Sequence, residues 1–242
     1  MKKIYLLEIF THSTLLALIT LLTFGSANFA NAQNMVGPNA EQNHQPQLSV
    51  NLAVLGNSSR TAADEFFEDA ERYERFGDFD AAIITFNKAA KEYKQDKKYN
   101  RYGATLIRLS NIHVLLSNYN EAEQIVLKQV LKNYSRIGSK AGQMSAYQQL
   151  GKIYYAANKL PQSLWFYTQH GILAQQLKDN NAYIESILGI ASVKIKKKDY
   201  QLAVKDLNAA ELLSKNNNTV QYNQLIKSSR AIIAERTATK KG

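Results

Sequence analysis

The stretch that decides the fold is "FGDFDAAIITFNKAAKEY", residues 76–93. A turn-like Gly77-Asp78 pair precedes a run in which small alanines share one helical side with bulky phenylalanines. Where two helices cross closely, only a small side chain leaves room for the facing backbone, and an aromatic ring fills the adjacent hole. The stretch therefore predicts the second helix of a tightly packed helical hairpin.

The same pattern recurs along the chain with spacings of 40, 41 and 40 residues. The small positions are Ala70, Ser110, Gly151 and Ala191, and then Ala82, Ala122, Ser163 and Ala203. The bulky positions are Phe79, Tyr119, Leu160 and Tyr200 after each turn, and then Phe86, Val126, Tyr167 and Leu207. Asp78, Asn118 and Asp199 are expected to cap the helices that follow them. A fixed period of this size indicates stacked units, here pairs of antiparallel helices.

These positions resemble the tetratricopeptide repeat (TPR) family, whose pattern is W-x2-L-G-x2-Y and then A-x3-F. The third unit matches best, with "YQQLGKIY" at 147–154 followed by Ser163 and Tyr167. The resemblance covers residues 63–217, divided into units 63–102, 103–143, 144–183 and 184–217. It implies an all-α, right-handed solenoid of about four helical hairpins.

The sequence departs from the family pattern in several places. The family period is about 34 residues, so the longer period here implies extended helices. His113 and Lys194 replace the expected tyrosine, and Gln129 and His170 replace a small residue. The closing proline is absent from every unit. Another kind of helical-hairpin solenoid is therefore the alternative.

The two ends of the chain differ from the repeats. Residues 218–236 predict a terminal helix that covers the open end of the solenoid, with Thr219 as its cap and residues 237–242 as a tail. Its apolar face carries Tyr222, Leu225, Ile226, Ser229, Ile232 and Ile233. A target-binding amphipathic helix is the alternative. Residues 33–62, rich in Asn and Gln, predict a flexible leader.

Residues 1–32 have the pattern of a secretory signal peptide. Two lysines come first, "STLLALITLLTF" follows at 13–24, and small residues precede a cleavage site after Ala32. The protein is then expected in the periplasm or secreted. An uncleaved membrane anchor is the alternative, but Glu8 interrupts that apolar span, where a charge is costly.

The composition excludes some chemistry. The chain has no cysteine, so disulfides and thiolate sites are impossible. No Gly-rich phosphate loop or H-E-x-x-H motif is present. His113 and His170 fall at core positions of the repeats and have no second ligand at helical spacing, so we expect no metal and no cofactor. Trp165 is expected in the core.

Charge is unevenly distributed. Residues 61–100 hold 7 basic and 10 acidic side chains, whereas residues 101–242 hold 20 basic and 8 acidic ones. The acidic run 64–74 predicts a solvated helix face, with an acidic docking patch as the alternative. The basic run "KIKKKDY" at 194–200 suits the negative end of a helix dipole, with polyanion binding as the alternative.

The resemblance also implies a binding surface. In the TPR family the first helix of each unit lines a concave groove that holds an extended peptide or a partner helix. The corresponding residues here are Phe67, Glu71, Ile107, Arg108, Asn111, Gln148, Lys152, Tyr155 and Ser192. Asn and Gln suit a peptide backbone, and Lys152 and Arg108 suit a carboxylate. The basic clamp of family members that bind chaperone C-termini is not reproduced, because Phe67 and Ile107 occupy its positions.

The sequence therefore predicts a non-enzymatic, exported adaptor that binds a protein segment in the cell envelope, with an acidic segment as one candidate. A binder of anionic envelope polymer or of a membrane surface, acting through the basic repeats, is the alternative. Nucleic acid is not an expected partner of an exported protein. An enzyme with a dispersed site is disfavoured because no catalytic constellation is visible.

Overall fold

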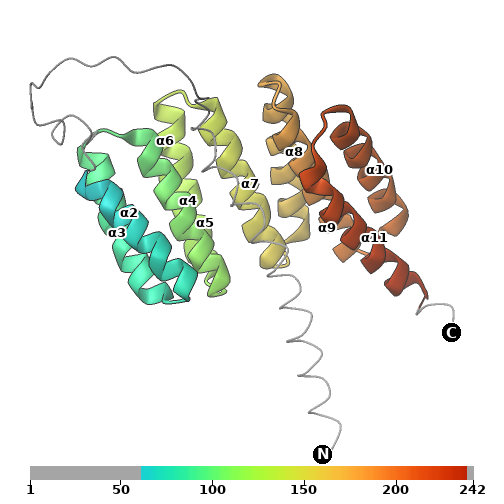
Figure 1. Ribbon diagram of the computed structural model, residues 1–242, viewed down its shortest axis with the longest axis horizontal. Helices are drawn as coiled ribbons and strands as arrows, with labels where there is room; N and C mark the ends of the chain where they lie inside the picture. Colours follow the sequence, from blue (N-terminus) through green and yellow to red (C-terminus); the bar gives the residue numbers. More distant parts are fainter. Residues whose placement is uncertain (1–60, 239–242) are drawn as a thin grey trace, which may run out of the picture. The chain divides into compact units, whose positions relative to one another are not determined.

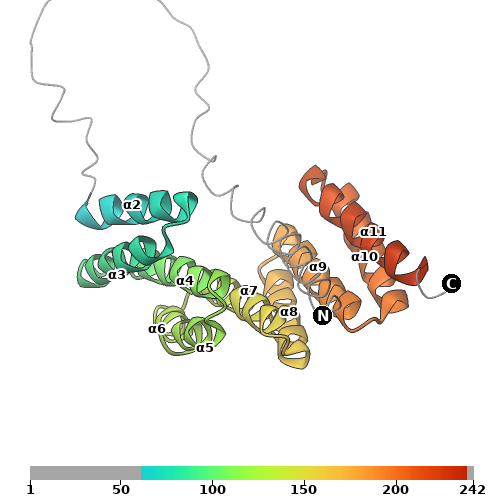
Figure 2. The same ribbon diagram turned by 90° about the horizontal axis from the view of Figure 1, so that it is seen from below.

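The computed structural model describes residues 61–238, and these are helical with no strand among them. The hairpins are α2 (Ala62–Phe76) with α3 (Phe79–Gln95), α4 (Tyr99–Leu115) with α5 (Tyr119–Gln124), η1 (Ile125–Val130) and α6 (Leu131–Arg136), α7 (Lys140–Ala156) with α8 (Leu160–Gln176), and α9 (Asn180–Lys196) with α10 (Tyr200–Asn216). A 3₁₀ turn, η2 (Val220–Tyr222), leads into α11 (Asn223–Ala238). Figure 1 shows the hairpins side by side in chain order, and Figure 2 shows the same helices after a quarter turn. The prediction of an all-α stack of helical hairpins is confirmed.

The signal peptide, the anchor alternative and most of the leader lie outside the described residues. So does the end of the predicted tail, residues 239–242. The unit boundaries predicted from the sequence fall inside α4, α7 and α9. The hairpins of the structure begin a few residues earlier, at the turns that precede these helices.

Helix length accounts for the long repeat period. Helices α3, α4, α7, α8, α9 and α10 each have 17 residues. Turns of three residues, such as 96–98 and 157–159, join them. Helix and turn together advance the chain by twenty residues, so a hairpin takes forty. The period is therefore set by one repeated helix length.

The single spacing of 41 residues has a separate cause. Between α5 and α6 the chain forms the π-helical segment Ile125–Val130, and a π-turn accommodates one extra residue within a helix. The spacing from Phe86 to Val126 is 40 residues, but that from Tyr93 to Tyr134 is 41, and all four side chains are buried. The insertion is therefore absorbed inside the second helix of the second hairpin.

This π-turn corrects one assignment made from the sequence. From the sequence, Gln129 was assigned to the repeat position that Ala89 and His170 occupy in their hairpins, but its side chain is exposed. The buried residue at that level is Val130, which has no exposed surface. Because the π-turn adds one residue just before Val130, the buried repeat position moves from residue 129 to residue 130.

The turns share one backbone geometry. Each contains one residue in the left-handed region, and these residues are Gly77, Lys97, Ser117, Gly138, Asn158, Lys178, Lys198 and Asn218. At the first turn the Asp78 N–H donates to the Tyr73 carbonyl at 3.0 Å and the Gly77 N–H donates to that of Glu74 at 3.1 Å. This pair of bonds is the Schellman motif, which satisfies carbonyls at a helix end.

The predicted caps are only partly correct. The Asp78 carboxylate accepts from the Ala81 N–H at 3.1 Å. Asn118, Asp199 and Thr219 make no such side-chain cap. The Thr219 hydroxyl instead donates back to the Ser214 carbonyl at 3.2 Å.

The small positions and the second set of bulky positions form the core as predicted, whereas Phe79, Tyr119, Leu160 and Tyr200 are only half-buried. Ala70, Ala82, Ser110, Ala122, Ser163 and Ala203 have no exposed surface, and Phe86, Val126 and Leu207 are equally buried. In the third hairpin the Ser163 hydroxyl donates to the Gly151 carbonyl at 2.8 Å, which shows the close crossing of α7 and α8 directly. The small residues therefore permit backbone contact within a hairpin.

Glycines also let a tyrosine pass between neighbouring hairpins. A Cβ atom on Gly151 of α7 would lie 2.8 Å from the Tyr167 ring, and one on Gly189 of α9 would lie 2.5 Å from it. Tyr134 lies in the same way between Gly103 of α4 and Gly142 of α7. A methyl group at these places would overlap the ring, so the glycines are required for the rings to pack where they do.

The terminal helix packs as predicted. Tyr222, Ile226, Ser229 and Ile233 are buried, and Leu225 and Ile232 pack beside them. Trp165 was expected in the core, and this was wrong: its side chain is 53% exposed. Its ring lies 4.6 Å from Phe166, whose own ring stacks on Tyr154 in the hairpin. The neighbouring residue, not the tryptophan, fills the inward position.

Candidate functional site

The residues assigned to a groove lie on α2, α4, α7 and α9. Several contact each other between hairpins, together with residues that the sequence did not single out. We call the following side chains the first-helix face: Glu71, Glu74, Arg108, Asn111, Gln148, Lys152, Tyr155, Glu185 and Lys196. Their partners divide the face into an internally paired part and a part that lacks counterions.

The α2–α4 part is internally paired. Arg108 donates to the Glu74 carboxylate at 2.7 Å and lies 3.2 Å from that of Glu71. Burial raises the pKa of Glu74, while the charge of Arg108 acts in the opposite direction. Arg108, expected from the sequence to hold a partner's carboxylate, is thus already engaged by two carboxylates of this chain.

Two predicted groove residues belong to the core. The Phe67 ring lies 5.5 Å from that of Phe86, edge to face, and 6.4 Å from that of Tyr93. Ile107 packs against the same cluster of buried residues. Both side chains are half-buried, so their main contacts hold the hairpins together.

Asn111 differs from its neighbours on α4. Its side chain is half-buried, and its amide makes no hydrogen bond with any residue of 61–238. The amide retains both donors and acceptor, which is the set that a peptide backbone needs.

An acid that the sequence analysis missed connects α7, α9 and the start of the terminal helix. Glu185 accepts from the Gln148 amide at 2.7 Å and from the Tyr222 hydroxyl at 3.2 Å. Burial raises the pKa of Glu185, and Lys152 and these two donors lower it. Glu185 precedes Ser192 by seven residues on one helix, so helical periodicity could have placed both on the same face.

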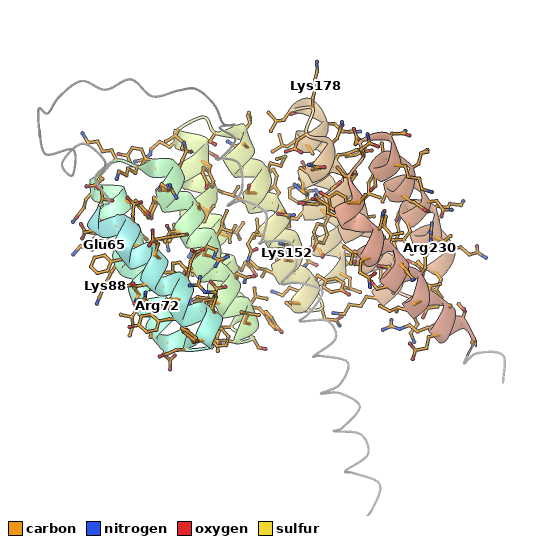
Figure 3. The ribbon with its side chains drawn as sticks, in the orientation of Figure 1. Glu65, Arg72, Lys88, Lys152, Lys178 and Arg230 are labelled. Carbon is orange, nitrogen blue, oxygen red and sulfur yellow. The ribbon has the colours of Figure 1, made fainter. Side chains whose placement is uncertain are left out.

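Lys152 lies half-buried about one turn before the end of α7, and Figure 3 labels it. No carboxylate among the described residues lies within ion-pair distance of its amine. Burial lowers the pKa of Lys152, and the charge of Glu185 opposes this effect. The pKa of His170 on α8 falls to about 4, because of burial and then because of the Lys152 charge.

Tyr155 lies one turn after Lys152 and is approached by a second lysine. The Lys196 amine donates to the Tyr155 carbonyl at 2.8 Å and lies 4.6 Å from the centre of its ring. Burial raises the pKa of the Tyr155 phenol, and the charge of Arg236 on α11 lowers it. The Ser192 hydroxyl, also predicted in the groove, donates to the Leu188 carbonyl of its own helix at 2.9 Å.

Two other lysines of the basic run form ion pairs. Lys194 forms an ion pair with Asp206 at 2.7 Å, and Lys197 forms one with Asp199 at 3.3 Å. Two of the charges expected to attract a polyanion are therefore partly neutralised within the fourth hairpin.

The described part of the chain has neither a candidate membrane-spanning helix nor a candidate metal site. Within it, no helix has the length and apolar character that crossing a membrane requires. No three His, Cys, Asp or Glu side chains within it are grouped so that they could hold a metal ion.

This chain is similar to known proteins in the arrangement of its helices. No protein-family model matches the sequence, and no curated protein matches it significantly. A kinesin-light-chain protein from Podosopora anserina with nearly identical TPR-like repeats superposes with a TM-score of 0.52 and 14% identity, over 72% of this chain and 95% of that one. The fold is of the TPR type.

Two other structures share this TPR-type fold. The apo form of RapI has a TM-score of 0.59 and 13% identity, over 76% of this chain and 73% of that one. BtubC (BKLC) from P. vanneervenii has a TM-score of 0.57 and 19% identity, and the match covers 64% of each chain. At these identities the similarity concerns the arrangement of helices and not the residues of a site.

Proposed function

We propose that this TPR-type protein is a non-catalytic scaffold whose first-helix face binds a segment of a partner protein. The observation that carries the proposal is the contrast on that face between paired and unpaired polar groups. Arg108, Gln148 and Glu185 have partners within the chain, whereas Asn111 and Lys152 are half-buried without one among the described residues. A bound polypeptide can pair with these two side chains without breaking a contact within the chain.

To test the proposal, Asn111, Gln148 and Lys152 are replaced together by alanine. The variant should keep its helical circular-dichroism spectrum, because none of the three side chains belongs to the apolar core and Glu185 keeps the Tyr222 hydroxyl as a donor when the Gln148 amide is lost. Capture of partners from a cell-envelope extract should weaken at least about tenfold, because a few residues carry most binding energy. The matched control replaces Gln162, Gln201 and Lys205, two amides and a lysine that are exposed on α8 and α10.

Equal capture by the two variants would contradict binding at the first-helix face. An anionic polymer or membrane surface would be indicated instead by three results together. Both variants would lose capture, high salt would abolish capture by the wild type, and capture by the wild type would survive protease treatment of the extract. That alternative draws on the basic side chains of residues 101–242 as a group.

We also propose that the protein acts in the cell envelope, as a periplasmic or secreted protein. The support is the signal-peptide pattern of residues 1–32. Protein extracted from the envelope should begin at Gln33 when its N-terminus is sequenced. A membrane-bound form that retains residues 13–24 would instead indicate an uncleaved anchor.

A further inference from the structure

Helix α8 differs from the second helix of every other described hairpin. None of its 17 residues is Asp, Glu, Lys or Arg, and its one histidine, His170, is buried. Each of the other second helices carries exposed charges. Examples are Lys88 and Lys91 on α3, Lys128 and Lys132 on η1 and α6, and Lys205 and Lys215 on α10. A second helix without charge therefore occurs once among the described hairpins.

We call the following six side chains the α8 outer face: Gln162, Trp165, Thr168, Gln169, Ile172 and Gln175. Gln169 is half-buried and the other five are exposed. The three amides make no hydrogen bond with any residue of 61–238, and the Thr168 hydroxyl donates only to the Leu164 carbonyl of its own helix. Depletion of charge together with an exposed aromatic side chain is typical of the centre of a protein interface.

Trp165 is held in position by contacts within its own hairpin. Its ring lies 4.6 Å from that of Phe166 and 6.4 Å from that of Tyr147 on α7, edge to face in both cases. Trp165 is nevertheless 53% exposed, and Ile172 is 42% exposed. Because residues seven apart lie on the same side of a helix, these two form one apolar strip. An ordered aromatic side chain loses little entropy on binding, so Trp165 is suited to anchor an interface.

The α8 outer face has the same pattern in both chain directions. Counted from the midpoint between Thr168 and Gln169, Trp165 and Ile172 are equally distant, and so are Gln162 and Gln175. In a dimer with two-fold symmetry, residue i contacts residue j of the other copy and residue j contacts residue i. An α8 helix that crosses its own copy antiparallel at this midpoint places Trp165 against Ile172 and Gln162 against Gln175. The face is therefore complementary to itself.

Charge also favours a second copy of this chain as the occupant of this face. The chain has a formal net charge of +10, so two copies repel each other over most of their surfaces. Beside a two-fold axis, a charged side chain would meet the same charge on the other copy. An amide both donates and accepts, so it pairs with its own kind. The amides form the rim of the contact, and the apolar pairs are expected to contribute most of its free energy.

We infer that two copies of this protein associate through their α8 outer faces, with the helices antiparallel and Trp165 of each copy against Ile172 of the other. The inference concerns a second helix and does not rest on the proposed function of the first-helix face. The dimer would present two first-helix faces, so a partner with two binding segments would gain avidity.

The test measures the oligomeric state of the protein as cells produce it, by sedimentation velocity at concentrations up to about 100 µM. The wild type is expected to be a dimer. Trp165→Glu and Ile172→Lys should each weaken dimerisation at least about tenfold, because each places unpaired charges in an apolar contact. Mixing the two variants should restore a dimer. One contact then pairs the introduced glutamate with the introduced lysine, and the other is the native contact of Trp165 with Ile172.

The matched control is Ile84→Glu, since Ile84 is an exposed apolar residue of another second helix, α3, and this variant should remain a dimer. Salt provides a second control. Lys159 and Lys178 flank α8 and face each other at the ends of the antiparallel pair, so added salt should preserve or strengthen the dimer.

A single cysteine tests the same contact without adding a charge. The chain has no cysteine of its own, so Thr168→Cys provides the only thiol, close to the two-fold axis. A short bis-maleimide linker should join two copies of this variant and should not join copies of Ile84→Cys. This result does not depend on the folding of the charged variants.

A wild type that stays monomeric at about 100 µM would overturn the inference. If Trp165→Glu then lost capture of envelope proteins, the occupant of the face would be a different protein. Dimers that persist in both charged variants, or that dissociate in high salt, would place the contact elsewhere and overturn the inference. Folded variants that stay monomeric when mixed, or equal cross-linking at positions 168 and 84, would overturn it as well.

Discussion

Replacing Phe86 by alanine is expected to lower the free energy of unfolding by about 3–5 kcal/mol. Phe86 has no exposed surface, and its ring meets that of Phe67 from the facing helix. The substitution leaves a cavity at the crossing of α2 and α3, because a backbone held by stacked hairpins collapses only partly around it. Urea denaturation followed by circular dichroism measures the loss.

The same helix provides the matched control. Ile84 lies two residues earlier on α3 and is 58% exposed. Ile84→Ala should change stability by no more than about 0.5 kcal/mol. Similar losses at Phe86 and Ile84 would mean that α3 does not pack on the face assigned to it. Substantial strand content in either spectrum would contradict the fold itself.

The stability of the protein is expected to fall on acidification because of His170. The side chain is 2% exposed, its Nδ1 atom has no hydrogen-bond partner among the described residues, and burial together with Lys152 lowers its pKa from 6.5 to about 4. Asp179 opposes this shift. Between these two values the unfolded chain binds a proton that the folded chain does not, so stability decreases as pH falls from 6.5 towards 4. The loss amounts to about 3 kcal/mol.

His170→Ala should remove this dependence. The corresponding repeat position in two other hairpins is alanine, at Ala89 and Ala210, so this position accepts a small residue. Unfolding free energies of wild type and variant are compared at several pH values between 7 and 4. Carboxylates titrate in both proteins, and their contribution cancels in the comparison. Parallel curves for the two proteins would show that His170 is protonated equally in the folded and unfolded states.

The sequence alone was sufficient to predict the hairpins. The alternation of small and bulky residues arises from contacts within one hairpin. These contacts join residues about twelve apart, such as Gly151 and Ser163. Such a contact recurs in every unit, so four copies of the pattern support one another. The one deviation in the repeat spacing has a local cause. The π-turn at Ile125–Val130 moves the following buried position by one residue.

The family resemblance indicated which helices carry the candidate site but not the state of its side chains. Arg108 and Lys152 look alike in the sequence as cations on first helices. The structure pairs Arg108 with Glu71 and Glu74, and leaves Lys152 with no described carboxylate in reach. Glu185 was missed, and Lys196 was assigned only to the basic run 194–200, because the repeat pattern specifies the buried positions and leaves the polar ones unconstrained.

What the sequence by itself determined is therefore the set of contacts that repeat within each hairpin: helix, turn, small residue, bulky residue. What only the tertiary structure decided is the pairing between hairpins, such as Gln148 with Glu185 and Lys196 with the Tyr155 carbonyl. Those partners are 37 and 41 residues apart and occur once each. Whether two long polar side chains meet depends on the stagger of neighbouring helices and on rotamers, and a repeating pattern of apolar residues fixes neither.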